Sequence, residues 1–182
     1  VMRFASGYLL DPARDHYILG WENGHATLGR EEERIAQSIV AGRGFSSPYY
    51  PVVTGPTALV GPVYVYLLAG IYKLFGTLTA ASTQAALVMN NSISSLICLP
   101  VYFIARRSFG QRIAVWSGWA WAFYPHAIVG PNAWIWDTVL GALLLTILIL
   151  CTLKLEGSTS YLAWLGWGLL WAIAALTNAN VL

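Results

Sequence analysis

Charge is what this sequence lacks over most of its length. After Lys73 only six residues are charged, and the stretches 74–105, 113–136, 138–153 and 157–182 contain none. Charged residues make up 10% of the 182 residues, and the mean hydropathy is +0.59. Soluble domains average roughly 25% charged residues. The composition therefore excludes an ordinary soluble domain and predicts a chain built mainly of membrane-embedded helices.

Two further shortages exclude other classes of protein. Cys98 and Cys151 are the only cysteines, and both fall within apolar stretches, where cysteine behaves as a small buried hydrophobe. No Cys-x-x-Cys motif is present, and His16 and His25 have no partners at metal-ligand spacing. We therefore expect no metal site. The net charge is only +2 and no basic stripe exists, so nucleic acid is not an expected partner.

Four apolar stretches are long enough to cross a membrane, which takes roughly 20 residues for roughly 30 Å of hydrocarbon. They are 80–105, 112–130, 132–153 and 159–180. Residues 1–10 are interpreted as the end of an earlier span, and the last span is followed by no polar tail, so we expect a chain truncated at both ends. The predicted fold class is an all-α polytopic membrane protein.

The positions of the basic residues predict the orientation. Arg106, Arg107 and Arg112 flank one short connection, which the positive-inside rule places in the cytoplasm. The polar segment 11–79 is then an outer-face loop, and its part 11–56 holds six acids against four bases. The connections with unusual polar residues, including Asn132 and Asp137, fall on the same outer side.

Two helices are expected within this outer loop. Residues 31–40 carry an apolar stripe formed by Ile35, Ala36, Ile39 and Val40, which predicts a helix lying along the membrane surface. The apolar residues 57–75 are interrupted by Gly61 and Pro62 and are too short to span, so they predict a juxtamembrane helix. In the first full span, Pro100 predicts a kink.

Candidate chemistry is concentrated in the acids of the outer loop. Glu22 or Glu31 could act as a general base towards an acceptor hydroxyl or amine. The alternative is that the run Glu31-Glu32-Glu33 is a solvated helix face. Asp137 is the only acid between Glu33 and Glu156 and lies among apolar residues, where an ionised group is costly and usually functional. Its alternative role is to start a helix at the membrane interface.

Further candidate substrate contacts lie near the same predicted face. Arg34 and Arg43 could each bind a phosphate through a guanidinium fork, or could instead pair with the neighbouring glutamates. His126 and Asn132 are included because they fall at the outer interface, although a lone histidine there is more often a structural, hydrogen-bonded residue.

Several short segments, taken in order, carry a resemblance. They are RIAQSIVAGRGFSSP at 34–48, TGPT at 54–57, GPVY at 61–64, KLFG at 73–76, RRSFG at 106–110, WAFYP at 121–125 and IWDT at 135–138. This ordered set, from about residue 8 to the end of the chain, resembles the N-terminal part of bacterial family 39-like glycosyltransferases. These integral membrane enzymes of the GT-C fold are related to protein O-mannosyltransferases and lipid A aminoarabinose transferases.

The resemblance implies a function. Such enzymes transfer a sugar from a polyprenyl-phosphate donor to a lipid, glycan or protein acceptor, with the active site on the outer face of the bacterial cytoplasmic membrane. It implies that Glu22 or Glu31 is the catalytic acid of the first outer loop and that Asp137 binds donor or acceptor. The Lys or His that many relatives carry before a Pro-Pro pair is replaced here by Val60-Gly61-Pro62. Arg43 could take over that phosphate contact.

Two alternatives stay open at the level of sequence. A transporter or lipid flippase module would use polar residues at mid-membrane depth, such as Asn90, Asn91 and Ser92, and would place its polar groups at the midplane. A non-catalytic membrane subunit would carry its acids merely as solvated groups. The sequence does not name the sugar or the acceptor, and it leaves open whether a divalent cation takes part.

Overall fold

The computed structural model describes residues 21–22, 25–26, 31–49 and 54–178. The expected end of an earlier span at 1–10 lies outside these residues. Apart from one two-residue antiparallel pair, β1 (Trp21–Glu22) with β2 (His25–Ala26), the described secondary structure is helical. The all-α prediction is therefore confirmed for the described part of the chain.

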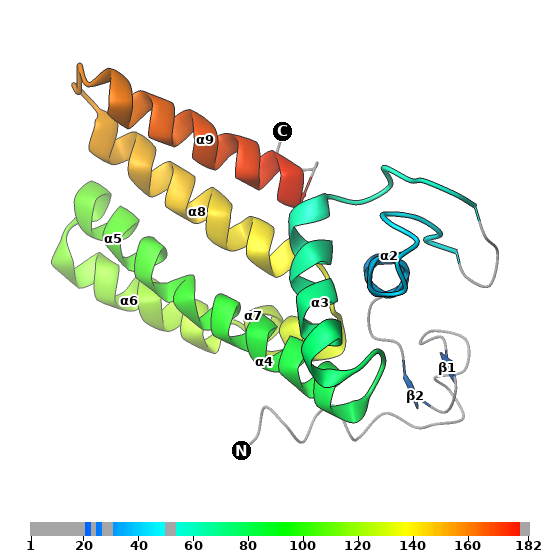
Figure 1. Cartoon of the computed structure of the whole chain (residues 1–182). Coiled ribbons are helices and arrows are strands. Elements are labelled where there is room, and N and C mark those ends of the chain that lie inside the picture. The colour runs from blue at the N-terminus through cyan, green and yellow to red at the C-terminus, as the bar shows by residue number, and fades with distance from the viewer. Residues whose placement is uncertain (1–20, 23–24, 27–30, 50–53, 179–182) are drawn as a thin grey trace.

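The helices are arranged as two antiparallel pairs closed at one end by a crossing helix (Figure 1). Their bounds are α2 (Glu31–Val40), α3 (Pro62–Phe75), α4 (Ala80–Leu96), α5 (Cys98–Phe109), α6 (Gln111–Phe123), α7 (Pro125–Ala133), α8 (Thr138–Leu155) and α9 (Tyr161–Thr177). Helices α5 and α6 form one pair, and α8 and α9 form the other. Helix α3 lies across the ends of α4 and α9, and α2 packs against α3.

The two helices predicted in the outer loop are both present. Helix α2 has the predicted bounds, and α3 occupies the apolar part of 57–75, beginning at Pro62. Pro62 is favoured at a helix start because its missing N–H would be unsatisfied there in any case. Ile35 and Ala36 of α2 are fully buried against a core that includes Tyr64 and Leu68 of α3. The apolar stripe of α2 thus packs on protein.

Prolines explain where the apolar stretches break into separate helices. Pro100 has no amide to bond to the carbonyl of Leu96, and the helix is interrupted there, since α4 ends at Leu96 and α5 begins at Cys98. The prediction of one continuous helix over 112–130 is wrong, because α6 ends at Phe123 and α7 begins at Pro125. A proline disfavours helical backbone geometry in the residue that precedes it. Tyr124, which precedes Pro125, is accordingly extended, with φ −63° and ψ 118°.

The predicted span 132–153 also needs correction at its start. Residues 132–133 belong to α7, Trp134 is extended with φ −139° and ψ 136°, and α8 begins only at Thr138. The following helix, α9, lies within the predicted 159–180. The extended segment between α7 and α8 matters because it brings Trp136 and Asp137 to the end of the bundle beside α3 and α2.

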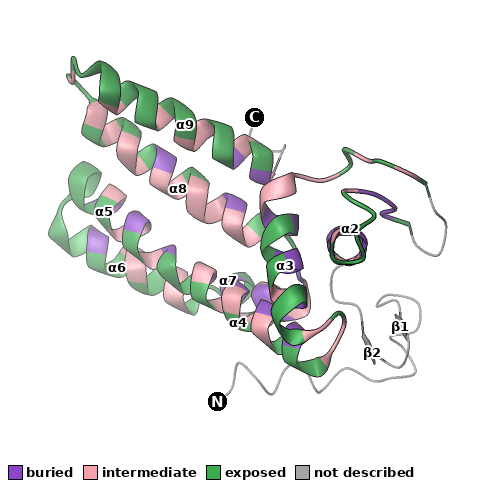
Figure 2. Cartoon of the chain, viewed as in Figure 1, coloured by how far each residue is buried: buried purple, intermediate pink, exposed green. Residues whose placement is uncertain are grey.

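Among the described residues, two helical stretches are long and apolar enough to cross a membrane. They are Ala80–Phe109, which combines α4 and α5, and Thr138–Leu155, with mean hydropathies of 1.6 and 2.3. Only 22% and 11% of their most apolar windows are buried within the protein. A core helix of a soluble protein would be mostly buried, whereas Figure 2 shows α8 and α9 largely exposed or half-buried.

Candidate functional site

A pocket of about 770 Å³ opens where α2, the start of α3, the start of α8 and the end of α9 meet. We call it the acid pocket because Glu32 and Asp137 both line it. The remaining lining residues are Phe45, Thr57, Ala58, Leu59, Val60, Gly61, Pro62, Tyr66, Trp136, Thr138, Ala175, Leu176 and Asn178. Four segments far apart in the sequence therefore bring two carboxylates and three aromatic rings to one place.

Glu32 is the more unusual of the two carboxylates. It is only 6% exposed, and its Oε2 atom has no hydrogen-bond partner among the described residues. Burial raises the pKa of Glu32 from 4.5 to about 7, a backbone hydrogen bond opposes the rise, and the negative charge of Asp137 adds to it. A carboxylate with a pKa near neutral pH is suited to accept and release a proton.

Asp137 is held at the N-terminus of α8. Its Oδ1 accepts a hydrogen bond of 3.0 Å from Nδ2 of Asn178, just beyond the C-terminus of α9, and its backbone carbonyl accepts the 2.8 Å bond from Gly141 that opens α8. Burial raises the pKa of Asp137, and the Asn178 bond opposes the rise. The sequence suggested that Asp137 either starts a helix or takes part in a functional site. In the structure it precedes the first residue of α8 and also lines the acid pocket.

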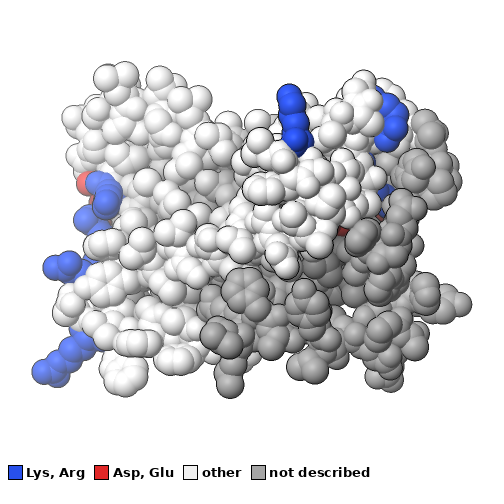
Figure 3. Space-filling model, turned by 60° about the horizontal axis from the view of Figure 1, so that its bottom comes forward, with Lys and Arg blue, Asp and Glu red and all other residues white. Residues whose placement is uncertain are grey.

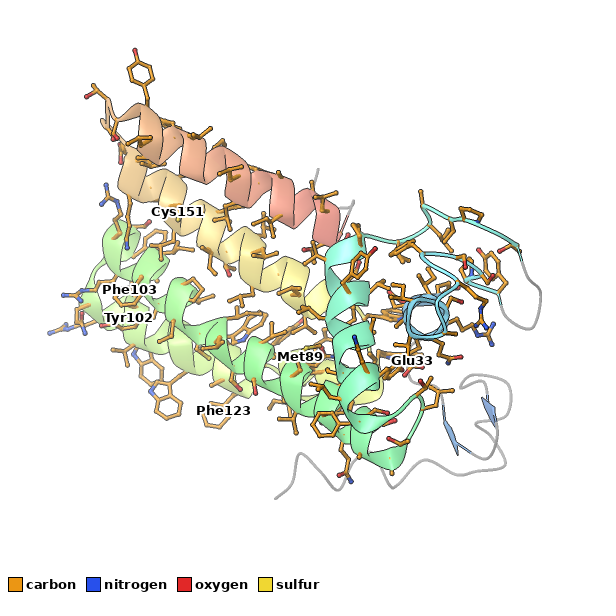
Figure 4. All side chains as sticks on the ribbon, viewed as in Figure 1. Glu33, Met89, Tyr102, Phe103, Phe123 and Cys151 are labelled. Carbon is orange, nitrogen blue, oxygen red and sulfur yellow. The ribbon has the colours of Figure 1, made fainter. Side chains whose placement is uncertain are left out.

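Buried hydrogen bonds fix the helices behind the acid pocket. The Tyr64 hydroxyl donates to Oδ1 of Asn90 over 2.9 Å, and Nδ2 of Asn90 donates to the Trp134 carbonyl over 3.3 Å. The Tyr72 hydroxyl of α3 donates to Oε1 of Glu33 in α2 over 3.0 Å; Figure 4 labels Glu33 beside these two helices. Glu33 therefore supports the packing of α2, and the idea that the acidic run is simply a solvated face is wrong for Glu32 and Glu33.

The polar residues of α4 are occupied in helix packing. Asn91 and Asn132 exchange side-chain hydrogen bonds of 2.9 and 3.2 Å, and the Ser94 hydroxyl donates to the Ala127 carbonyl over 2.9 Å. Asn132, a predicted substrate contact, is buried beside Asn91 and does not line the acid pocket. Of the side chains that favoured a transport path, Asn90 and Asn91 thus have partners on neighbouring segments, whereas Ser92 bonds to the Val88 carbonyl of its own helix.

A second, apolar pocket of about 230 Å³ adjoins the first. It lies among α4, α6, α7 and α8, and we call it the apolar pocket. Its lining residues are Ser94, Ile97, Trp121, His126, Ala127, Gly130, Pro131, Trp134, Trp136, Thr138, Val139 and Ala142. Trp136 and Thr138 line both pockets, and Trp134 and Trp136 stack with ring centroids 5.1 Å apart. The structure places His126, a candidate substrate contact, in this second pocket.

The structure brings only some of the sequence candidates together. The side chain of Glu22 lies outside the described residues, although its backbone pairs with His25. Glu31 is half-buried at the start of α2, and Arg34 and Arg43 line neither pocket. Within the described chain, no group of three or more His, Cys, Asp and Glu is placed to hold a metal ion.

Glu32 is absent from the sequence candidates, although the sequence holds a signal for it. It precedes Ile35, Ala36 and Ile39 by three, four and seven residues, which places it on the apolar stripe of the helix. Glu31 lies about 100° around the helix from Glu32, which places it at the edge of that stripe. An acid on the buried face of an amphipathic helix is expected to be costly and purposeful.

Comparison with known proteins adds no assignment: no protein-family model, curated protein or solved structure matches the chain.

Proposed function

We propose that this chain is part of a membrane glycosyltransferase that moves a sugar from a polyprenyl-phosphate donor to an acceptor at the outer face of the bacterial cytoplasmic membrane. The observation that carries the proposal is the pair of adjoining pockets. One holds two carboxylates and the other is mainly apolar, and Trp136 and Thr138 line both. This arrangement suits a ligand with a polar head and an apolar chain.

The chemistry follows from the acid pocket. The acceptor hydroxyl attacks the anomeric carbon of the donor, the bond from that carbon to the phosphate oxygen breaks, and polyprenyl phosphate leaves with the bonding electrons. The hydroxyl proton passes to Glu32, whose pKa of about 7 suits a general base. Asp137, held by Asn178, orients a sugar hydroxyl. The backbone N–H groups of the first turn of α8 suit the phosphate, since a helix N-terminus favours anions.

A membrane setting is supported by shape and charge together. The two long apolar helical stretches are poorly buried within the protein. Many of the large side chains of α6, α8 and α9 are exposed hydrophobics, which a soluble surface rarely gathers in such number. The arginine-rich connection between α5 and α6 lies at the far end of the bundle from α2 and α3 (Figure 1), as the positive-inside rule requires if the acid pocket is outside.

The test is a transfer assay on the full-length protein that contains this chain, because a fragment is not expected to be active alone, purified and placed in lipid vesicles. Radiolabelled sugars on polyprenyl phosphate are supplied as a panel that varies the sugar, together with membrane extract as the source of acceptor. We expect one donor to give time-dependent transfer of label. If no donor in the panel is turned over while the protein remains folded, the transferase proposal is wrong.

Filling the apolar pocket should discriminate between donors by chain length. We expect Ala142→Phe to raise the KM for a long-chain donor about tenfold or more, since losing burial of two or three CH₂ groups costs about 2 kcal/mol. A donor with a single isoprene unit should be affected little. The control is Ala172→Phe, the same change at an exposed site on α9. An equal effect of Ala142→Phe on both donors would argue against a chain in this pocket.

The pH dependence of transfer should report on Glu32. A base must be ionised, so we expect the rate to fall as pH drops through about 7, where Glu32 becomes protonated. Because the negative charge of Asp137 adds to the raised pKa of Glu32, Asp137→Asn should move this acid limb to lower pH in the residual activity. The measurement is kcat/KM across the neutral range of pH, with Glu156→Gln as the control. An acid limb that does not move in Asp137→Asn would show that the two groups are not coupled.

A further inference from the structure

The outer face of α6 carries an apolar groove far from the acid pocket. Val115, Trp116, Trp119, Ala120 and Phe123 line this groove of about 560 Å³. Trp116 is 74% exposed and Phe123 is 70% exposed, and the rings of Trp119 and Phe123 stack with centroids 5.5 Å apart. Figure 4 shows Phe123 projecting from α6 away from the other helices. We call this surface the α6 groove.

A group of arginine residues lies at one end of the α6 groove. Arg112 precedes Trp116 by four residues and Trp119 by seven, which places it on the same face of α6. Arg106 and Arg107 lie across the Gly110 turn, in the last turn of α5. Lys and Arg gather at this end of the molecule (Figure 3).

Two of the three arginines at this end, Arg106 and Arg112, have no ion-pair partner within the described residues. Glu156 contacts Arg107 over 3.4 Å, and no carboxylate of the described residues lies within 4 Å of Arg106 or Arg112. All three side chains are exposed. A guanidinium matches the oxygens of a phosphate in a bidentate fork, so the free charge favours a phosphate ligand.

The distance along α6 from its basic end to the far end of the α6 groove matches the thickness of one leaflet of a bilayer. From Arg112 to Phe123 are eleven residue steps, or about 16 Å at 1.5 Å per residue. Half of a hydrocarbon core of about 30 Å is about 15 Å. A lipid whose headgroup lies at Arg112 would therefore have its acyl chain beside the aromatic rings as far as Phe123.

We propose that the α6 groove is a binding site for one anionic phospholipid, with its phosphate at Arg112 and one acyl chain against Trp116, Trp119 and Phe123. This rests on the membrane setting of the proposed function but not on sugar transfer. The exposed arginines beside a purely apolar groove favour an anionic lipid over a zwitterionic one, because basic residues at the membrane surface attract anionic headgroups.

Bromine-labelled acyl chains quench tryptophan fluorescence on contact, and this gives a direct test. The purified protein is placed in nanodiscs containing equal mole fractions of brominated phosphatidylglycerol or brominated phosphatidylcholine. We expect stronger quenching by the phosphatidylglycerol. The double variant Trp116→Phe, Trp119→Phe should lose this difference, because those rings are the reporters.

The role of the charge is tested by comparing two basic residues. Arg112→Gln should abolish the preference for phosphatidylglycerol, whereas Lys73→Gln, a change at an exposed lysine on α3, should retain it. Equal circular dichroism melts would show that both variants are folded. Equal quenching by the two lipids in the wild type, or a preference that survives Arg112→Gln, would overturn the proposal. So would an absence of quenching at Trp116 and Trp119, which would mean that protein covers the groove.

Discussion

Replacing Glu32 by Gln is expected to reduce sugar transfer by at least about a hundredfold, the usual contribution of a general base. The amide has nearly the same size as the carboxylate, so packing of α2 against α3 should be preserved. It cannot accept the acceptor proton, however. We also expect the substitution to spare stability, because Gln removes a buried carboxyl whose ionised form is disfavoured by burial. The measurement is kcat for the donor identified in the vesicle assay, alongside a thermal melt.

Three further variants make this result specific. Glu156→Gln removes an exposed acid at the opposite end of the bundle and should leave kcat unchanged. Glu22→Gln and Glu31→Gln test the two acids that the family resemblance favours. If either of them abolishes transfer while Glu32→Gln retains it, the base is not Glu32. The acid pocket would then serve binding and not proton transfer.

The local elements of this fold could be predicted well from the sequence. The apolar stripe beginning at Ile35 and the Gly42 that follows give α2 its bounds, and both signals act within a few residues of the helix. The errors also have local causes. An apolar run shows where a span could be but not where its helix is interrupted, and the break before Pro125 follows from the same proline chemistry that predicts the kink at Pro100.

Only some residues of the acid pocket could be identified from the sequence in this way. Asp137 could be found because a single acid in an apolar run is conspicuous at the level of composition. Its partner Asn178 follows 41 residues later, and their contact depends on how α8 and α9 pack, which no local pattern specifies. Glu32 could have been identified from its position on the apolar face of its helix. The apolar pocket could not be predicted from sequence, because it is formed only when α4, α6, α7 and α8 pack together.

A second large effect is expected at Gly61, where α3 meets the end of α9. A Cβ atom at Gly61 would fall on the backbone carbonyl oxygen of Thr177 and on that of Leu176. The φ of Gly61 is −64°, a value that any residue adopts, so the penalty comes wholly from this close approach. Backbone cannot move aside as the end of a flexible side chain can. We therefore expect Gly61→Ala to destabilise the protein by about 1–3 kcal/mol or more, as overpacking does.

The matched control, Gly70, lies within the helix α3 that Gly61 precedes. A Cβ atom at Gly70 would meet nothing within 4 Å, so Gly70→Ala should be neutral or stabilising by up to about 1 kcal/mol, because alanine favours a helix over glycine. Thermal unfolding of both variants in detergent, followed by tryptophan fluorescence, gives the comparison. Gly61 also lines the acid pocket, so any Gly61→Ala protein that folds should transfer sugar more slowly than Gly70→Ala. If Gly61→Ala unfolds at the same temperature as the wild type, α3 and α9 do not approach this closely. The arrangement of these two helices around Asp137 would then differ from the one described.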